Sequence, residues 1–219
     1  MTATEIPADP ESPVAERSAA ETSADPESPV AQSASLCRAI VEAQRWITSI
    51  YRLDLDLRAE QFVVDPGTAL RLLPPDSPRS GLVVVEEPAE ISVGIYIDAA
   101  DVDDPWTVIE ETSHLLYLAW LADRDWSVSR LVLEFQSEVD RYAVARLKGR
   151  DGLACFEGFT WCDWMDAQTR ERYATAHHRA RAYCRSLERR YRRRSDTPAL
   201  LSELRHFYRA APDQKLNAA

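Results

Sequence analysis

One helix-length segment, Trp106 to Trp120, constrains the fold of this chain more than any other, because apolar residues recur on almost every side of it. An amphipathic surface helix leaves one polar face, whereas a helix that is apolar nearly all round is buried by other elements. Asp104 and Pro105 suit the N-cap and the first helical position, so we expect the helix to begin there and to reach about Ala122. The rest of the chain must therefore supply elements that cover it.

The elements on either side of this helix predict an α+β fold. Apolar spacing indicates a helix from Ser35 to about Tyr51, followed by short strand-like runs. These runs are Gln61–Val64, Leu70–Leu73, Leu82–Val85 and Ile91–Ile97, of which the last two predict a hairpin. Further helices are expected from Ser127 or Ser129 to about Lys148, from Ala167 to Arg194 and from Pro198 to about Ala210. The expected order is an N-terminal helix, a small, mostly antiparallel sheet and a helical half.

Residues 1–35 differ in composition from the rest of the chain. They carry seven acids and one base, contain several prolines, and repeat the octapeptide Ala8–Ala15 as Ala24–Ala31. Such a segment lacks the apolar surface that would offset the entropy lost on ordering. We expect a disordered acidic tail over residues 1–35 and a single domain over residues 36–219.

The overall composition argues against several classes of function. The formal net charge of −10 opposes binding to nucleic acid and to acidic membrane surfaces. The longest apolar stretch, Leu115–Ala122, is far shorter than the ~20 residues of a membrane span, and we expect no secretory signal. The four cysteines match neither a zinc knuckle nor a disulfide scaffold, so free thiols and a cytoplasmic location are expected.

Three ionisable residues lie within the apolar central helix, namely Glu110, Glu111 and His114. Residues three and four apart share one side of a helix, so both carboxylates can reach the imidazole. Buried ionisable groups are costly unless they are paired, protonated or bound to a metal ion. This cluster is therefore the strongest candidate for a functional site.

The segment Glu110-Glu111-Thr112-Ser113-His114 resembles the His-Glu-x-x-His motif of the zincin metallopeptidases, with Glu at the first position. In that family two residues one turn apart bind zinc, and the Glu between them activates the metal-bound water. The resemblance implies a zincin-like fold, Zn²⁺ or another divalent metal on Glu110 and His114, and Glu111 as the catalytic general base. The implied function is a metal-dependent hydrolase, most simply a peptidase with a peptide or protein substrate.

The gluzincin branch of that family takes its third ligand from a Glu on the following helix, and two residues fit that position. Glu138 shares an apolar face with Phe135 and Tyr142, and is our first choice. Glu134 neighbours Arg130 and Arg141, which is typical of a surface ion pair, and is our second choice.

Other parts of the resemblance imply supporting roles. The segment Ser137–Ala143 is similar to the Glu-Ala-Asp-x-Phe-Ala segment of several zincin families, which implies that Asp140 supports the site. Ile91–Ile97 is the candidate edge strand beside the cleft, where a substrate backbone could pair. Tyr117, one turn beyond His114, is a candidate supporting residue.

Different interpretations of these residues stay open. The Glu and His side chains could form a buried network with arginines, with Glu138 in a salt bridge to Arg141 or to the Arg-rich helix. A di-iron bundle would need a second Glu-x-x-His, which the sequence lacks. Residues 166–194 hold ten arginines and three acids, so a non-catalytic protein could hold an acidic partner along 169–194. His177 and His178 are expected on the solvated face of that helix.

Overall fold

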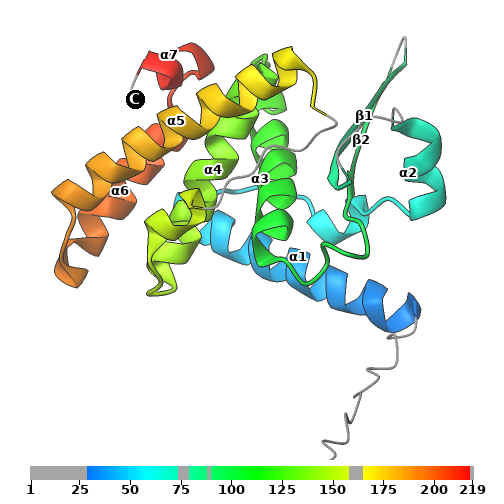
Figure 1. The fold of residues 1–219 in the computed structure, drawn as a ribbon, viewed down its shortest axis with the longest axis horizontal. Coiled ribbons are helices and arrows are strands. Elements are labelled where there is room, and N and C mark those ends of the chain that lie inside the picture. The colour runs from blue at the N-terminus through cyan, green and yellow to red at the C-terminus, as the bar shows by residue number, and fades with distance from the viewer. Residues whose placement is uncertain (1–28, 74–78, 88–89, 158–164, 218–219) are drawn as a thin grey trace, which may run out of the picture.

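The computed structural model describes residues 29–73, 79–87, 90–157 and 165–217. Over these residues the chain is mainly helical and contains one two-stranded antiparallel sheet, so the expected α+β class is confirmed (Figure 1). The helices are α1 (Pro29–Tyr51), α2 (Pro66–Leu72), α3 (Pro105–Ala122), α4 (Arg130–Leu147), α5 (Ala167–Arg190), α6 (Thr197–Arg209) and α7 (Pro212–Asn217), with short 3₁₀ turns at η1 (Ala59–Phe62), η2 (Gly152–Phe156) and η3 (Arg194–Asp196). Among these helices none combines the length and the apolarity that crossing a bilayer requires.

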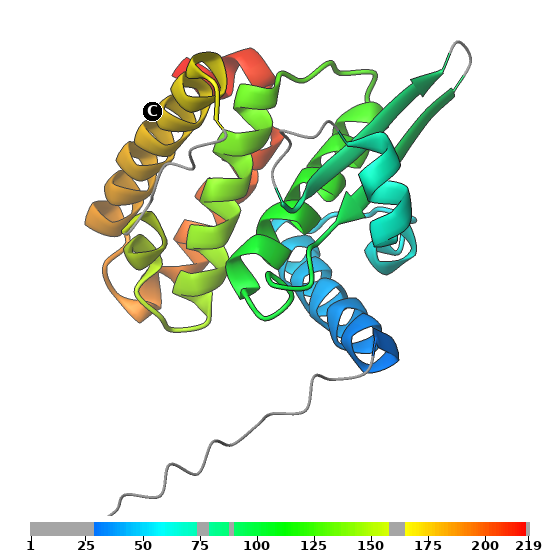
Figure 2. The ribbon, with the colours of Figure 1, turned by 45° about the vertical axis from the view of Figure 1, so that its right-hand side comes forward.

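Helix α3 is the central element, as its apolar sequence predicts. It packs against α1, α4 and the hairpin, which surround it in both views (Figures 1 and 2). Asp104 caps it by accepting hydrogen bonds from the backbone N–H groups of Trp106 and Thr107, and Pro105 occupies the first turn. The predicted start and end of this helix are confirmed.

Helix α4 lies between α3 and α5 (Figure 2). Ser129 caps it by accepting a hydrogen bond from the backbone N–H of Val132, as one of the two expected caps. Because neighbours cover α4 on two sides, polar residues on those sides are buried. The expectation that Glu134 lies at the surface is therefore wrong, since only 8% of this residue is exposed.

The hairpin consists of β1 (Gly81–Glu87) and β2 (Glu90–Tyr96), paired antiparallel with Val84 opposite Val93. It confirms the hairpin expected from the sequence. The outer edge of β2 is partly occupied, because the backbone N–H of Val64 donates to the carbonyl of Ile95 at 2.8 Å. This contact leaves less of β2 available to pair with a substrate than the sequence suggested.

The two other expected strands are wrong. Of residues 61–64, Gln61 and Phe62 belong to η1, and Val63 forms an isolated bridge to Ile95. Residues 70–72 are the end of α2, because Asp65 accepts a hydrogen bond from the backbone N–H of Thr68 and Pro66 opens the helix. A local capping signal thus outweighs the β-type composition of that segment.

The ends of the chain also differ from expectation. Helix α1 begins at Pro29, so residues 29–35 form helical turns where the sequence predicted a tail. The rest of that expected tail, residues 1–28, lies outside the described residues, as do Cys162, Trp161 and Trp164. The other three cysteines are free thiols. Helix α5 ends at Arg190 rather than Arg194, and α7 was not expected at all.

Candidate metal centre

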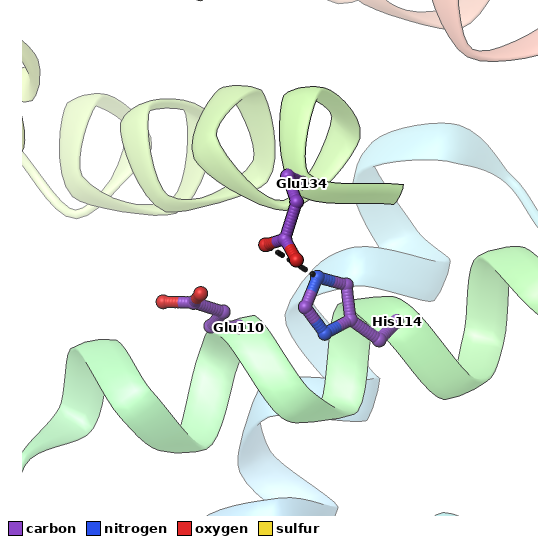
Figure 3. Close-up of side chains that lie close together, drawn as sticks. All are labelled: Glu110, His114 and Glu134. Carbon is purple, nitrogen blue, oxygen red and sulfur yellow. Dashed lines mark ion pairs between the residues drawn. The ribbon is translucent and has the colours of Figure 1, made fainter. Parts of the chain in front are cut away.

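Three side chains converge between helices α3 and α4. Glu110 and His114 come from α3 and Glu134 from α4, and one ligand atom from each lies within 4.8 Å of the others (Figure 3). Nε2 of His114 is 3.6 Å from Oε2 of Glu134. Two ligands on a tetrahedral zinc ion at ~2.1 Å would stand about 3.4 Å apart, so this pair already has the spacing of two zinc ligands.

The ring of His114 is held in place on its other side by Glu111. Nδ1 of His114 lies 3.4 Å from Oε2 of Glu111, and both residues are more than nine-tenths buried. The opposite nitrogen, Nε2, has no hydrogen-bond partner among the described residues. Burial alone would lower the pKa of His114, but the carboxylates of Glu111 and Glu134 outweigh burial and raise it well above its usual value. The site therefore holds either a protonated imidazole or a neutral one bound to a cation.

Glu110 faces an arginine as well as the histidine. Nη1 of Arg141 lies 3.0 Å from Oε2 of Glu110 and 3.8 Å from Oε2 of Glu138. Burial raises the pKa of Glu110 to about 7, with Glu111 and Glu134 adding to the increase and Arg141 opposing it. Arg141 thus neutralises part of the group, as the alternative interpretation of a buried network predicted.

Glu138, the first choice as third ligand, lies outside the group. Its Oε1 is 3.3 Å from Nδ1 of His177 on α5, and its Oε2 has no hydrogen-bond partner among the described residues. It therefore makes the contacts to Arg141 and to the Arg-rich helix that the sequence left as its alternative role. The expectation that His177 is solvated is wrong, because 12% of its side chain is exposed, whereas His178 is exposed as expected.

Two residues near the group were not assigned to it from the sequence. Tyr173 of α5 lies against the carboxylates, since burial and then Glu134, Glu110 and Glu111 raise its pKa far above the usual value. Nothing in the local sequence pattern around Tyr173 identifies the acids that it contacts on other helices. Arg141 lies seven residues after Glu134, so the two share one side of α4, and that spacing was a usable signal.

Asp140 is not part of the group, and Tyr117 is fully buried against the rings of Trp120 and Tyr208. Asp140 is fully buried and accepts hydrogen bonds from Ser113 at 2.5 Å, from Gln136 at 2.7 Å and from Tyr51. Burial raises its pKa to about 6 in spite of these bonds. Because Ser113 precedes His114, Asp140 fixes the turn of α3 that carries the histidine.

No family model matches the chain, and neither the curated proteins nor the solved structures contain a match to it. The likeness to zincins therefore depends on the residues of α3 and α4 quoted above. What the described residues define is an α+β protein with a buried group of carboxylates around one imidazole.

Proposed function

We propose that this protein binds a divalent cation, Zn²⁺ in the first instance, through Glu110, His114 and Glu134, and that it is a zincin-like, metal-dependent hydrolase of peptide bonds. One observation carries the proposal: the buried Nε2 of His114 has no hydrogen-bond partner and is directed toward a carboxylate at ligand spacing. A buried polar atom normally makes a hydrogen bond, so a nitrogen that lies 3.6 Å from a carboxylate without such a bond favours an ion between the two.

The charge of the surroundings also supports a cation. Four carboxylates, those of Glu110, Glu111, Glu134 and Glu138, face the guanidinium of Arg141 and two imidazoles. With neutral imidazoles the formal charge is −3, which is costly in a buried setting. A divalent ion would remove most of it. Arg141 contacts Oε2 of Glu110, so the guanidinium would compete with the ion for the negative charge of that carboxylate.

Each residue would have a separate role. Glu134 and Glu110 would supply oxygen ligands, and His114 would supply Nε2 while Glu111 accepts the proton on Nδ1. A bound divalent ion lowers the pKa of a coordinated water and makes it a nucleophile near neutral pH. Glu111 is the proposed general base, as in the zincin motif. Tyr173 lies against the carboxylates of the same site.

The test compares two neighbouring carboxylates on α4. We would titrate the chelator-treated protein with Zn²⁺, and measure hydrolysis of a mixed peptide library with and without the ion. Glu134→Gln should lower Zn²⁺ affinity at least tenfold, whereas Glu138→Gln should leave it within about twofold. Loss of binding in Glu138→Gln alone would assign the third ligand to Glu138, and failure of the wild type to bind Zn²⁺ at micromolar concentration would refute the metal site. A metal-bound protein that hydrolyses no peptide would refute the peptidase.

A second function is supported by the surface of α5. Exposed arginines cluster at its C-terminal end and in the residues that follow, at Arg185, Arg189, Arg190, Arg192, Arg193 and Arg194. Arg190 is paired with Glu203, and the cluster as a whole is strongly basic. We propose that this cluster holds an acidic protein partner. Binding of a poly-glutamate peptide that weakens steeply with salt, and that is lost in Arg189→Ser/Arg193→Ser, would support it.

A further inference from the structure

A cavity of about 340 Å³ lies between α5 and α6. Tyr183, Ser186 and Arg190 line it from α5, at spacings of three and four residues that keep them on one side of the helix. Glu203 and Phe207 line it from α6. Small-molecule sites are concave, combine apolar walls with a few converging polar groups, and begin at a volume of ~300 Å³. The size and the lining of this cavity therefore suit a small molecule.

The hydroxyl group of Tyr183 is the buried polar group of the cavity. Only 4% of this residue is exposed, and the hydroxyl has no hydrogen-bond partner among the described residues. Burial, followed by Glu203, raises the pKa of Tyr183 far above its usual value, while Arg190 opposes the increase. The hydroxyl therefore keeps its proton and lies near both charged residues of the lining. Because a buried hydroxyl group normally makes a hydrogen bond, this one points to a ligand that would supply it.

An ion pair in the lining supplies one charge of each sign. Nη2 of Arg190 lies 3.2 Å from Oε1 of Glu203, and 47% and 28% of the two side chains are exposed. An exposed pair of this kind contributes little to stability, so its partners can separate at low cost. Together the two residues carry no net formal charge, and each can offer its own charge to a ligand group of the opposite sign.

Two stacked rings form the apolar wall of the cavity. The ring centres of Tyr183 and Phe207 are 4.3 Å apart, with 22° between the ring planes. Phe207 also meets Phe135 of α4 edge to face at 5.3 Å, and all three residues are buried. The wall is thus part of the protein core and is present without a ligand.

We propose that this cavity binds a free amino acid with an apolar side chain, in its zwitterionic form. The carboxylate of the amino acid pairs with Arg190 and its ammonium group pairs with Glu203, so that two ion pairs replace one. Tyr183 donates a hydrogen bond to the same carboxylate, and the apolar side chain lies against Phe207. A ligand with a single charge would stand beside a like charge on Arg190 or Glu203, which favours the zwitterion.

The cavity is separate from the proposed metal centre. Tyr183 lies ten residues after Tyr173 on α5, which corresponds to about 15 Å along the helix axis. Tyr173 is the residue of α5 that lies against the carboxylate of Glu134. The proposal therefore does not depend on metal binding, and either site can fail its test without the other.

The experiment is an NMR chemical-shift titration of the full chain with three related compounds. L-Phenylalanine carries both charged groups, 3-phenylpropanoate lacks the ammonium group, and 2-phenylethylamine lacks the carboxylate. L-Phenylalanine should shift the amide signals of residues 183–190 and 203–210 with saturation, and each of the other two should bind at least fivefold more weakly. Equal binding of either analogue would overturn the zwitterion, and absence of saturable binding of L-phenylalanine at millimolar concentration would overturn the site.

Two tyrosine variants test the location. Tyr183→Phe keeps the stacked ring and removes only the hydroxyl group, so it should fold and should bind L-phenylalanine at least fivefold more weakly. Tyr208→Phe is the matched control, because it also removes a buried hydroxyl without a hydrogen-bond partner, and Tyr208 is not among the described residues that line the cavity. Its affinity should equal that of the wild type. Unchanged binding in Tyr183→Phe would contradict the proposal.

Discussion

Arg141 lies between two carboxylates of different elements, with Nη1 3.0 Å from Oε2 of Glu110 on α3 and 3.8 Å from Oε2 of Glu138 on its own helix. It therefore holds a positive charge beside the place proposed for a metal ion. The guanidinium and the ion would compete for Glu110. Each of them would offset part of the negative charge of the carboxylates, and Arg141 alone leaves most of it.

Replacing Arg141 should separate these two effects. Arg141→Met should raise the affinity for Zn²⁺ about tenfold, because Glu110 no longer has a competing partner. Without metal the variant should be less stable by ~3 kcal/mol, since one partner of a buried ion pair is removed. Zinc titration and denaturant unfolding with and without chelator would measure both. Arg146→Met is the control: Arg146 lies on α4 like Arg141 but pairs with Glu188 on α5, and its loss should not change zinc affinity.

The stability of the metal-free protein should fall as pH rises. The folded protein raises the pKa of His114 well above its usual value, of Glu110 to about 7 and of Asp140 to about 6. A group whose pKa is raised in the folded state takes up protons on folding. Its contribution to stability is fully present at pH below its pKa in the unfolded chain, and is lost as pH rises through its pKa in the folded protein. For Glu110 alone the difference amounts to roughly 3 kcal/mol. Melting curves between pH 5 and pH 9 should show the decline.

Saturating Zn²⁺ should reverse this trend over the same range. Metal and protons compete for Nε2 of His114 and for Glu110, so binding releases protons and strengthens as pH rises. The gain in melting temperature on adding Zn²⁺ should therefore be larger at pH 8 than at pH 6. An equal gain at both values would place the ion somewhere other than on these two residues.

Two variants of Glu111 distinguish a base from a residue that orients His114. Glu111→Gln keeps an oxygen that accepts the proton on Nδ1, so zinc should stay bound while hydrolysis is lost. Glu111→Ala removes the contact seen at 3.4 Å, and zinc affinity should fall ~10–100-fold, as it does when such supporting contacts are removed. If Glu111→Gln still hydrolyses peptides, Glu111 is not the general base and only orients His114.

The network around Asp140 should dominate the stability of the core. Asp140→Ala leaves three buried donors, those of Tyr51, Ser113 and Gln136, without their acceptor, and should cost about 3–5 kcal/mol. Ser137→Ala removes one hydrogen bond to the backbone of the same helix and should cost about 1 kcal/mol. Similar losses in the two variants would contradict the central role of Asp140.

Gly94 is required by the contact between β2 and the segment before α2. A Cβ at this position would lie 2.3 Å from Cγ2 of Val64 and 3.2 Å from the carbonyl oxygen of Phe62. Gly94→Ala should therefore cost about 1–3 kcal/mol through overpacking. Val64→Ala removes the closest atom, so the double variant should be more stable than Gly94→Ala alone in denaturant unfolding.

The sequence predicted those features that local chemistry determines. The cap at Asp104 and the apolar surroundings of His114 placed α3 correctly, and the β-branched runs Leu82–Val85 and Ile91–Ile97 placed the hairpin. The spacing of Glu110 and His114 also placed them on one side of a helix, where the structure has them.

Features that depend on packing between distant elements were not predictable in the same way. Whether Glu134 or Glu138 joins His114 depends on where α3 and α5 contact α4. The local sequence of α4 does not determine either contact. The burial of Lys215 likewise requires rings from α3 and α6 to meet around it. A single lysine in a polar C-terminal segment gives no sign of this.

Helix α4 connects the two polar centres of the molecule. Glu134 faces His114, while Gln136 and Asp140, on another side of the same rigid helix, hold Lys215 and Ser113. A rotation of α4 by one residue position would turn its side chains by ~100° and break both sets of contacts together. The contact of Glu134 with His114 and the contacts of Gln136 and Asp140 with Lys215 and Ser113 therefore depend on one and the same orientation of α4.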